Sequence, residues 1–97
     1  MQWPLPFSPI ERLEDKPKFE LELSRELKSG HPLFGVPVVA IGWRADSDDV
    51  LFEILNNNGA VAEVHLTWAG ERERPPWPGT VMFNSFEEWA ESVRKDS

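Results

Sequence analysis

The stretch from residue 36 to residue 68 constrains the fold most, because short runs of alternating or β-branched residues are separated there by polar turns. Alternation with a period of two is typical of strands with one buried face. The segment 56–59 reads Asn-Asn-Asn-Gly and predicts a tight hairpin turn, since asparagine and glycine accept positive φ angles. We therefore expect strands over 36–44, 50–55 and 60–68, arranged as an antiparallel meander.

A helix is predicted before this block, over residues 17–29. Pro17 suits a first helical turn, and Asp15 stands where an N-cap residue is expected. Gly30 fits the left-handed position that follows a helix. The apolar stripe consists of Phe19, Leu23 and Leu27. The remaining helix surface is expected to be covered by Glu20, Glu22, Arg25 and Glu26.

A second helix is predicted after the strands. Ser85 is followed three residues later by Glu88, which is a capping box. Trp89 falls on the apolar face of this helix and is expected in the core. A charged, proline-rich loop over 69–79 precedes it, and residues 80–83 can form a short edge strand.

The element order predicts an α+β fold, written α-β-β-β-(β)-α, with a sheet of three or four antiparallel strands. We expect both helices to cover one face of this sheet. The other face would then stay partly open and carry Glu63, His65 and Thr67. A chain of 97 residues has room for a single domain of this kind.

Residues 1–16 are predicted to form an extended arm in front of a domain at 17–97. Pro4, Pro6 and Pro9 each remove a backbone donor, which disfavours a helix or a central strand. The apolar residues of the arm, Trp3, Leu5, Phe7 and Ile10, are expected to pack across the domain. The alternative is a short apolar peptide for the groove of a partner.

Charge and composition exclude several classes of function. The formal net charge is −7, so the average field repels a phosphate backbone and argues against nucleic-acid binding. Acidity alone favours solubility, and a basic partner is a secondary interpretation. The chain has no cysteine, which rules out disulfides, thiolate nucleophiles and cysteine zinc sites.

The sequence predicts neither a signal peptide in its first residues nor a membrane span. The start has no basic segment and too many prolines for a secretory signal. The longest uncharged apolar stretch, 33–43, is interrupted by Pro37 and is too short to span a bilayer. We expect a cytoplasmic protein that is not bound to a membrane.

His65 is the candidate for acid-base chemistry, with Glu63 two residues away on the same strand face. The alternative, which we favour, is a half-exposed histidine on a solvated sheet. His31 is a further candidate, although capping of the preceding helix is the expected role. Two histidines without helical ligand spacing do not make a metal site, and the turn at 46–49 lacks the glycine and glutamate of a calcium loop. No metal and no cofactor are expected.

The tryptophans carry the binding hypothesis. Trp43, Trp68 and Trp77 fall near strand ends or in the proline-rich loop, where large rings serve as anchors for partners. Together with His65 they are the predicted binding residues. The alternative is that they belong to the core of a small domain, and for Trp77, between Pro76 and Pro78, both interpretations stay open.

Four spaced segments resemble a group of small, uncharacterised bacterial proteins. They begin at Gly30, Asp48, Val64 and Trp77 and read GHPLFG, DDVLF, VHLTW and WP followed by Thr80. The resemblance covers residues 20–90. It implies a bacterial, cytoplasmic, stand-alone domain, and it implies no activity, ligand or catalytic residue.

Two functions remain as hypotheses. The first is a non-enzymatic protein-interaction module of the immunity or accessory type, which binds through the aromatic residues and the open sheet face. The second is a small enzyme or ligand-binding protein that uses His65 as acid or base, assisted by His31, Glu63 or Asp49. A homodimer formed through the open face or the edge at 80–83 is compatible with either.

Overall fold

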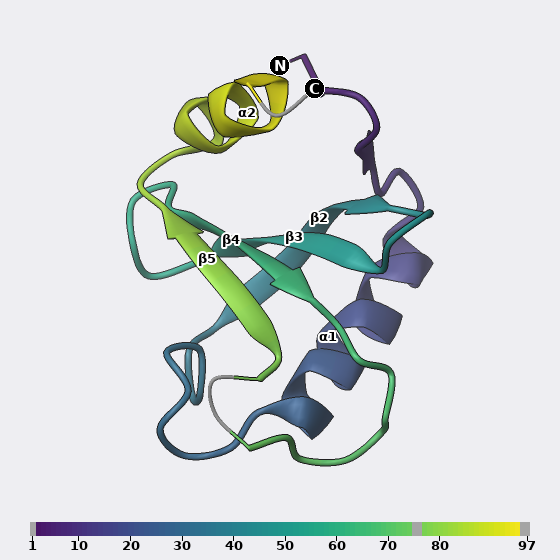
Figure 1. The fold of residues 1–97 in the computed structure, drawn as a ribbon, viewed down its shortest axis with the longest axis vertical. Coiled ribbons are helices and arrows are strands. Elements are labelled where there is room, and N and C mark those ends of the chain that lie inside the picture. Colours follow the sequence, from purple (N-terminus) through teal and green to yellow (C-terminus); the bar gives the residue numbers. More distant parts are fainter. Residues whose placement is uncertain (1, 75–76, 96–97) are drawn as a thin grey trace.

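The computed structural model describes residues 2–74 and 77–95. Five antiparallel strands form one sheet in the order β1-β2-β3-β4-β5, with one helix before β2 and one after β5 (Figure 1). The strands are β1 Ser8–Pro9, β2 Val38–Arg44, β3 Asp49–Ile54, β4 Val61–His65 and β5 Gly79–Phe83. The helices are α1 Lys16–Glu26 and α2 Phe86–Lys95.

The sheet confirms the predicted α+β meander and its edge strand β5. The turn at 56–59 adopts the expected conformation, with φ of 40° at Asn58 and 85° at Gly59. The first strand, β1, was not predicted, because Ser8 and Pro9 pair with β2 for only two residues. A proline is tolerated there since β1 lies at the edge of the sheet.

Helix α1 is shorter than the predicted 17–29. Pro17 lies in its first turn as expected, but Asp15 makes no capping hydrogen bond through its side chain. A 3-10 turn over Leu13–Asp15 leads directly into the helix. The helix ends at Glu26, because Leu27 is already extended with ψ of 137°. None of the helices formed by the described residues is long and apolar enough to cross a membrane.

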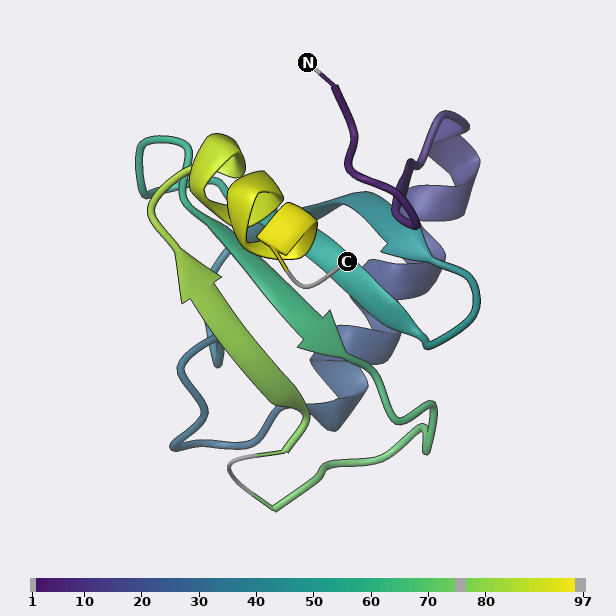
Figure 2. The ribbon, with the colours of Figure 1, turned by 45° about the horizontal axis from the view of Figure 1, so that its top comes forward.

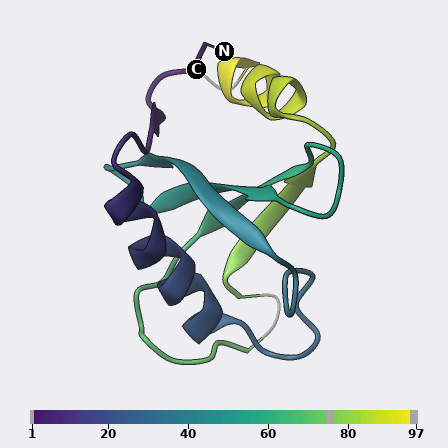
Figure 3. The same cartoon turned by 180° about the vertical axis from the view of Figure 1, so that it is seen from behind.

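The expectation that both helices cover one face of the sheet is wrong. The sheet lies between α1 and α2, as the front view, the view tilted forward and the view from behind show (Figures 1, 2 and 3). The physical reason is that the strands carry apolar side chains on both faces, with Leu51 and Val61 on the side of α2. The core on the side of α1 includes Phe19, Leu23, Val50, Phe52, Ala62 and Val64.

The arm closes the core on the side of α2. Phe7 is buried, and the Trp3 ring packs edge-on against Phe86, with 5.0 Å between ring centroids. The register of β2 shifts between Ala40 and Gly42, which is a β-bulge. Gly42 is required at this point, because a side chain there would occupy the position of the Trp3 ring.

Candidate interaction surface

Helix α2 covers only part of the sheet face beneath it. Phe86, Trp89 and Ala90 pack toward Leu51 and Val61, near the end of β5 where the helix begins. The start of β5 runs away from α2 toward the loop after β4 (Figures 1 and 2). The sheet face therefore has a covered part and an uncovered part.

Glu63 marks the boundary between these two parts. Its Oε1 accepts a hydrogen bond of 2.8 Å from the indole Nε1 of Trp89. Glu63 thus helps to attach α2 to the sheet. It was the predicted acid-base partner of His65, but its carboxylate is hydrogen-bonded to Trp89. Beyond Glu63, the next residue of β4 on this face is His65, and its side chain is 54% exposed.

Trp77 lies on the uncovered part together with His65. The register pairs His65 with Gly79, and partners in an antiparallel pair point to the same face. A side chain added to Gly79 would meet the Trp77 ring at 3.6 Å, so the indole lies over Gly79 on this face. Val81 follows on the same face, opposite Glu63. We call His65, Trp77 and Val81 the uncovered sheet surface; Trp77 is 54% and Val81 is 56% exposed.

His65 has a carboxylate partner on the neighbouring strand. Its Nδ1 lies 2.8 Å from Oδ1 of Asp49, and Ser47 donates a hydrogen bond of 2.8 Å to the other oxygen of Asp49. Because a carboxylate only accepts, Nδ1 donates this hydrogen bond. This orients the ring. His65 lines none of the cavities described below.

His31 is buried and structural. Its Nε2 donates to the Pro78 carbonyl oxygen at 2.9 Å, and its Nδ1 accepts from the Leu33 amide at 3.0 Å. Thr80 Oγ1 lies 3.2 Å from the same Nε2. His31 therefore fastens the start of β5 and does not cap α1 through its side chain. It is not joined to His65, and residues 2–74 and 77–95 contain no group of three potential metal ligands.

Trp43 and Trp68 lie on the other face of the sheet. Both flank Phe19 of α1, with ring centroids 5.5 Å and 6.0 Å away. The structure therefore separates the predicted binding residues into two places: His65 with Trp77, and Trp43 with Trp68. Pro76, which flanks Trp77 in the sequence, lies outside the described residues.

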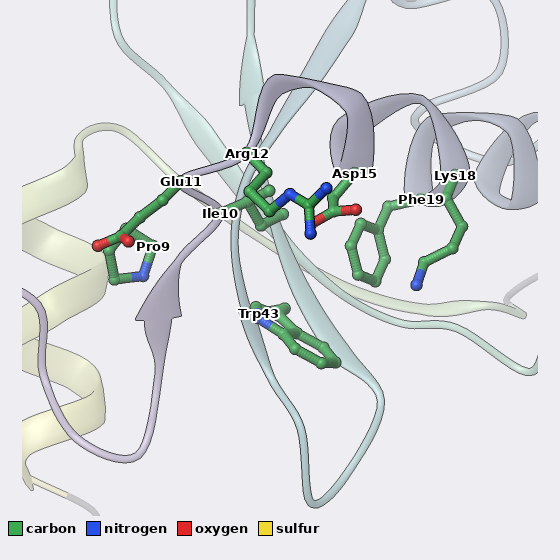
Figure 4. A pocket seen from close by; sticks show the side chains of 8 residues that line it. All are labelled: Pro9, Ile10, Glu11, Arg12, Asp15, Lys18, Phe19 and Trp43. Carbon is green, nitrogen blue, oxygen red and sulfur yellow. The ribbon is translucent and has the colours of Figure 1, made fainter.

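A cavity of about 350 Å³ opens beside Trp43 (Figure 4). It is lined by Pro9, Ile10, Glu11, Arg12, Asp15, Lys18, Phe19 and Trp43. The charges of opposite sign are close to balanced there, and Arg12 is held by Glu14 at 2.6 Å. The Lys18 Nζ lies 5.1 Å from the centroid of the Phe19 ring. Arg12 and Lys18 thus each have a partner within the chain, and we assign no ligand to this cavity.

The structure also buries two carboxyl groups that were expected on the surface. Glu22 and Glu26 are 4% and 0% exposed. Glu26 accepts hydrogen bonds from the amides of Thr67 and Trp68, at 3.0 Å and 2.9 Å for the closest oxygens. Glu22 accepts from the Gly70 amide at 3.0 Å. The two side chains fasten the loop after β4 onto α1.

The spacing along α1 contained the signal for this burial. Glu22 and Glu26 stand three residues after Phe19 and Leu23, so they lie beside the apolar stripe of the helix. Helical periodicity alone predicts that both side chains face solvent, because glutamate is rarely buried without a partner. Their partners are backbone amides of a distant loop, which composition and periodicity do not identify.

The carboxyl pair predicts an unusual dependence of stability on pH. Burial, together with the adjacent Glu22, raises the pKa of Glu26 from 4.5 to about 7, against the backbone hydrogen bonds, which lower it. The folded state therefore keeps a proton that the unfolded state releases near 4.5. This bound proton stabilises the folded state. Its contribution to the free energy of unfolding is fully present below pH 4.5 and is lost as the pH rises through about 7. We expect the free energy of unfolding to fall between pH 5 and 7 by on the order of 1 kcal/mol per pH unit.

Urea denaturation across this pH range measures the slope. The variant Glu22→Gln is the matched control, because it removes the neighbouring negative charge and keeps an oxygen for the Gly70 amide. Its slope should be clearly smaller than that of the wild type. If the free energy of unfolding of the wild type stayed constant or rose over this pH range, the raised pKa of Glu26 in the folded state would be contradicted.

The chain was also compared with known proteins. No protein-family model matches it, and neither a curated protein nor a solved structure shows significant similarity to it.

Proposed function

We propose that the domain is a non-enzymatic protein-interaction module of the immunity or accessory type, acting in a bacterial cytoplasm. The supporting observation is the uncovered sheet surface. Three neighbouring side chains, His65, Trp77 and Val81, are each more than half exposed on a sheet face that α2 leaves partly open. Exposed apolar groups that lie together favour a binding surface.

Trp77 is the expected anchor of this surface. An indole ring buries a large area on binding and loses little conformational entropy, which is why tryptophan is enriched at the energetic centres of interfaces. His65 adds a polar group beside it, and Asp49 fixes the orientation of that group. An apolar anchor next to an oriented polar side chain suits recognition of a protein.

The charge of the chain indicates the kind of partner. The formal net charge of −7 attracts a basic protein and accelerates its association at low ionic strength. The same charge repels nucleic acids. We therefore propose a protein partner that is basic around its contact surface.

Photo-crosslinking in cells of the source organism tests this function. The photo-reactive residue p-benzoylphenylalanine is placed at position 77 in one variant and at position 21 in the control, because Leu21 is also exposed but lies on α1. We expect one protein to be crosslinked from position 77 and not from position 21. An excess of unlabelled wild-type domain should compete, whereas the Trp77→Ala domain should compete ~10-fold less well.

Equal crosslinking from the two positions, or none from position 77, would show that the uncovered sheet surface is not the binding surface. Competition by the Trp77→Ala domain as strong as by the wild type would remove Trp77 from the proposal. Both outcomes are read from the same gel, so the control and the test share their conditions.

The pairing of His65 with Asp49 supports a second function, a small enzyme or ligand-binding protein with His65 as acid or base. A carboxylate that orients a histidine is a common feature of acid-base sites. A fragment screen by nuclear magnetic resonance separates the two functions. Shifts confined to residues 47, 49 and 65, and absent in His65→Ala, would favour a small ligand. If no such shifts were observed, the protein-interaction module would be the remaining function.

A further inference from the structure

The outer edge of β5 carries backbone groups that pair with nothing in the described sheet. The Leu66 amide donates to Asp48 and the Ile54 amide donates to Ala60, so the even-numbered residues of β4 bond to β3. The odd-numbered residues of β4 then bond to β5. In the observed register their partners are Gly79, Val81 and Phe83. The amides and carbonyls of Thr80 and Met82 consequently point outward.

This edge lacks the devices that usually prevent pairing with another chain. Exposed edges are commonly protected by charged side chains, proline or a bulge. Strand β5 is five residues long, and it contains none of these between Gly79 and Phe83. Val81 and Met82 are 56% and 44% exposed, on opposite faces of the strand. The edge therefore offers main-chain hydrogen bonds with an apolar side chain on each side.

A cavity of about 410 Å³ adjoins the same strand and adds charge. It is lined by Phe83, Glu88, Glu91, Ser92 and Lys95, so it touches the sheet only at β5. Glu88 and Glu91 are exposed carboxylates, and Arg94 contacts Glu91 only loosely, at 3.9 Å. A lysine or arginine side chain of a strand added at β5 would lie beside this cavity, whose lining holds the two carboxylates and one ammonium group, that of Lys95.

We propose that β5 binds an extended basic segment of the partner protein, which adds to the sheet as a sixth strand. This proposal rests on the interaction function above and names the partner's chemistry. The hydrogen bonds to Thr80 and Met82 supply affinity, and alternate side chains of the segment contact Val81 or Met82. A second copy of this chain is the less suitable occupant, because each copy carries a formal charge of −7.

The test measures peptide binding by fluorescence anisotropy. The probe is a labelled synthetic peptide of about eight residues that alternates valine and lysine, and its control alternates valine and glutamate. The variant Met82→Pro removes the outward amide without removing a bond to β4, and Met82→Val is its matched control. Circular dichroism checks that each variant is folded.

We expect the basic peptide to bind the wild type and Met82→Val at least ~10-fold more tightly than Met82→Pro. The acidic peptide should bind at least ~10-fold more weakly than the basic one. Hydrogen exchange gives a second measurement that needs no variant. The peptide should slow exchange of the Thr80 and Met82 amides and leave the Val81 amide, which already bonds to β4, nearly unchanged.

Several outcomes would overturn the proposal. These are absence of binding, equal binding to Met82→Pro with no protection of the two amides, or equal binding of the acidic peptide. A wild-type dimer in light scattering that Met82→Pro abolishes would assign the edge to a second copy of the chain. Crosslinking from position 77 distinguishes failure of this proposal from failure of the proposed function. A partner crosslinked from position 77, without any peptide binding at β5, would support the interaction function and would rule out β5 as its binding edge.

Discussion

Replacing Trp89 with alanine is expected to lower the free energy of unfolding by ~3–5 kcal/mol, as removal of a fully buried indole does. Trp89 is 0% exposed and forms the centre of the core beneath α2. Its ring packs against Trp3 and Phe7, with centroid distances of 5.6 Å and 4.9 Å. Its loss therefore weakens the attachment of both α2 and the arm. Urea denaturation followed by fluorescence and circular dichroism measures the change.

Trp89→Phe is the control that separates packing from hydrogen bonding. Phenylalanine keeps most of the ring contacts and loses the hydrogen bond to Glu63, so we expect a smaller loss of ~1–2 kcal/mol. If Trp89→Ala were no less stable than Trp89→Phe, the core beneath α2 would not hold the helix to the sheet.

Replacing Glu26 with alanine is expected to cost ~2–4 kcal/mol, because buried amides then lose their acceptor. The amides of Thr67 and Trp68 both donate to this carboxyl group, which fastens the loop after β4. We expect faster hydrogen exchange of these two amides together with the loss of stability.

Arg25→Ala is the matched control for this variant. Arg25 is the neighbouring residue on α1 and is exposed, so its replacement should change stability by less than ~0.5 kcal/mol. A Glu26→Ala domain as stable as Arg25→Ala would mean that the loop is held by other contacts. In that case the pH dependence attributed to Glu26 should also be absent.

The sequence predicted the meander well because its turns are local. Asn58 and Gly59 define the hairpin within four residues, and Ser85 accepts the expected hydrogen bond from the Glu88 amide at 3.1 Å. Such signals do not depend on distant parts of the chain. The sheet order then follows from short connections between neighbouring strands.

The prediction of one covered face failed because alternation was interpreted as one apolar and one polar side. In β4 the polar side begins with Val61, which is buried beneath α2, and only Glu63 and His65 are polar. In β3, Leu51 lies on the same sheet face as Val61 and is likewise buried beneath α2. A period of two identifies the two faces of a strand, and it does not say whether a second layer covers the more polar one.

The candidate surface was predicted only in part. His65 and Trp77 were each identified by residue type, but their proximity depends on the register between β4 and β5. Asp49 was named as an assistant to His65, and that contact likewise depends on the pairing of β3 with β4. Long-range register is fixed by the packing of the whole sheet, so it is not visible in a local pattern.

The sheet that separates the two cores also divides the molecule into layers that can respond independently. Helix α2 rests on one side of the sheet together with Trp3 and Phe7 of the arm, while the core around α1, which includes Ile10 of the arm, is built from other side chains. Partial opening of the α2 layer therefore need not melt the rest. Such an opening would extend the surface at His65 across Leu51 and Val61, giving a partner a larger apolar platform than the closed domain presents.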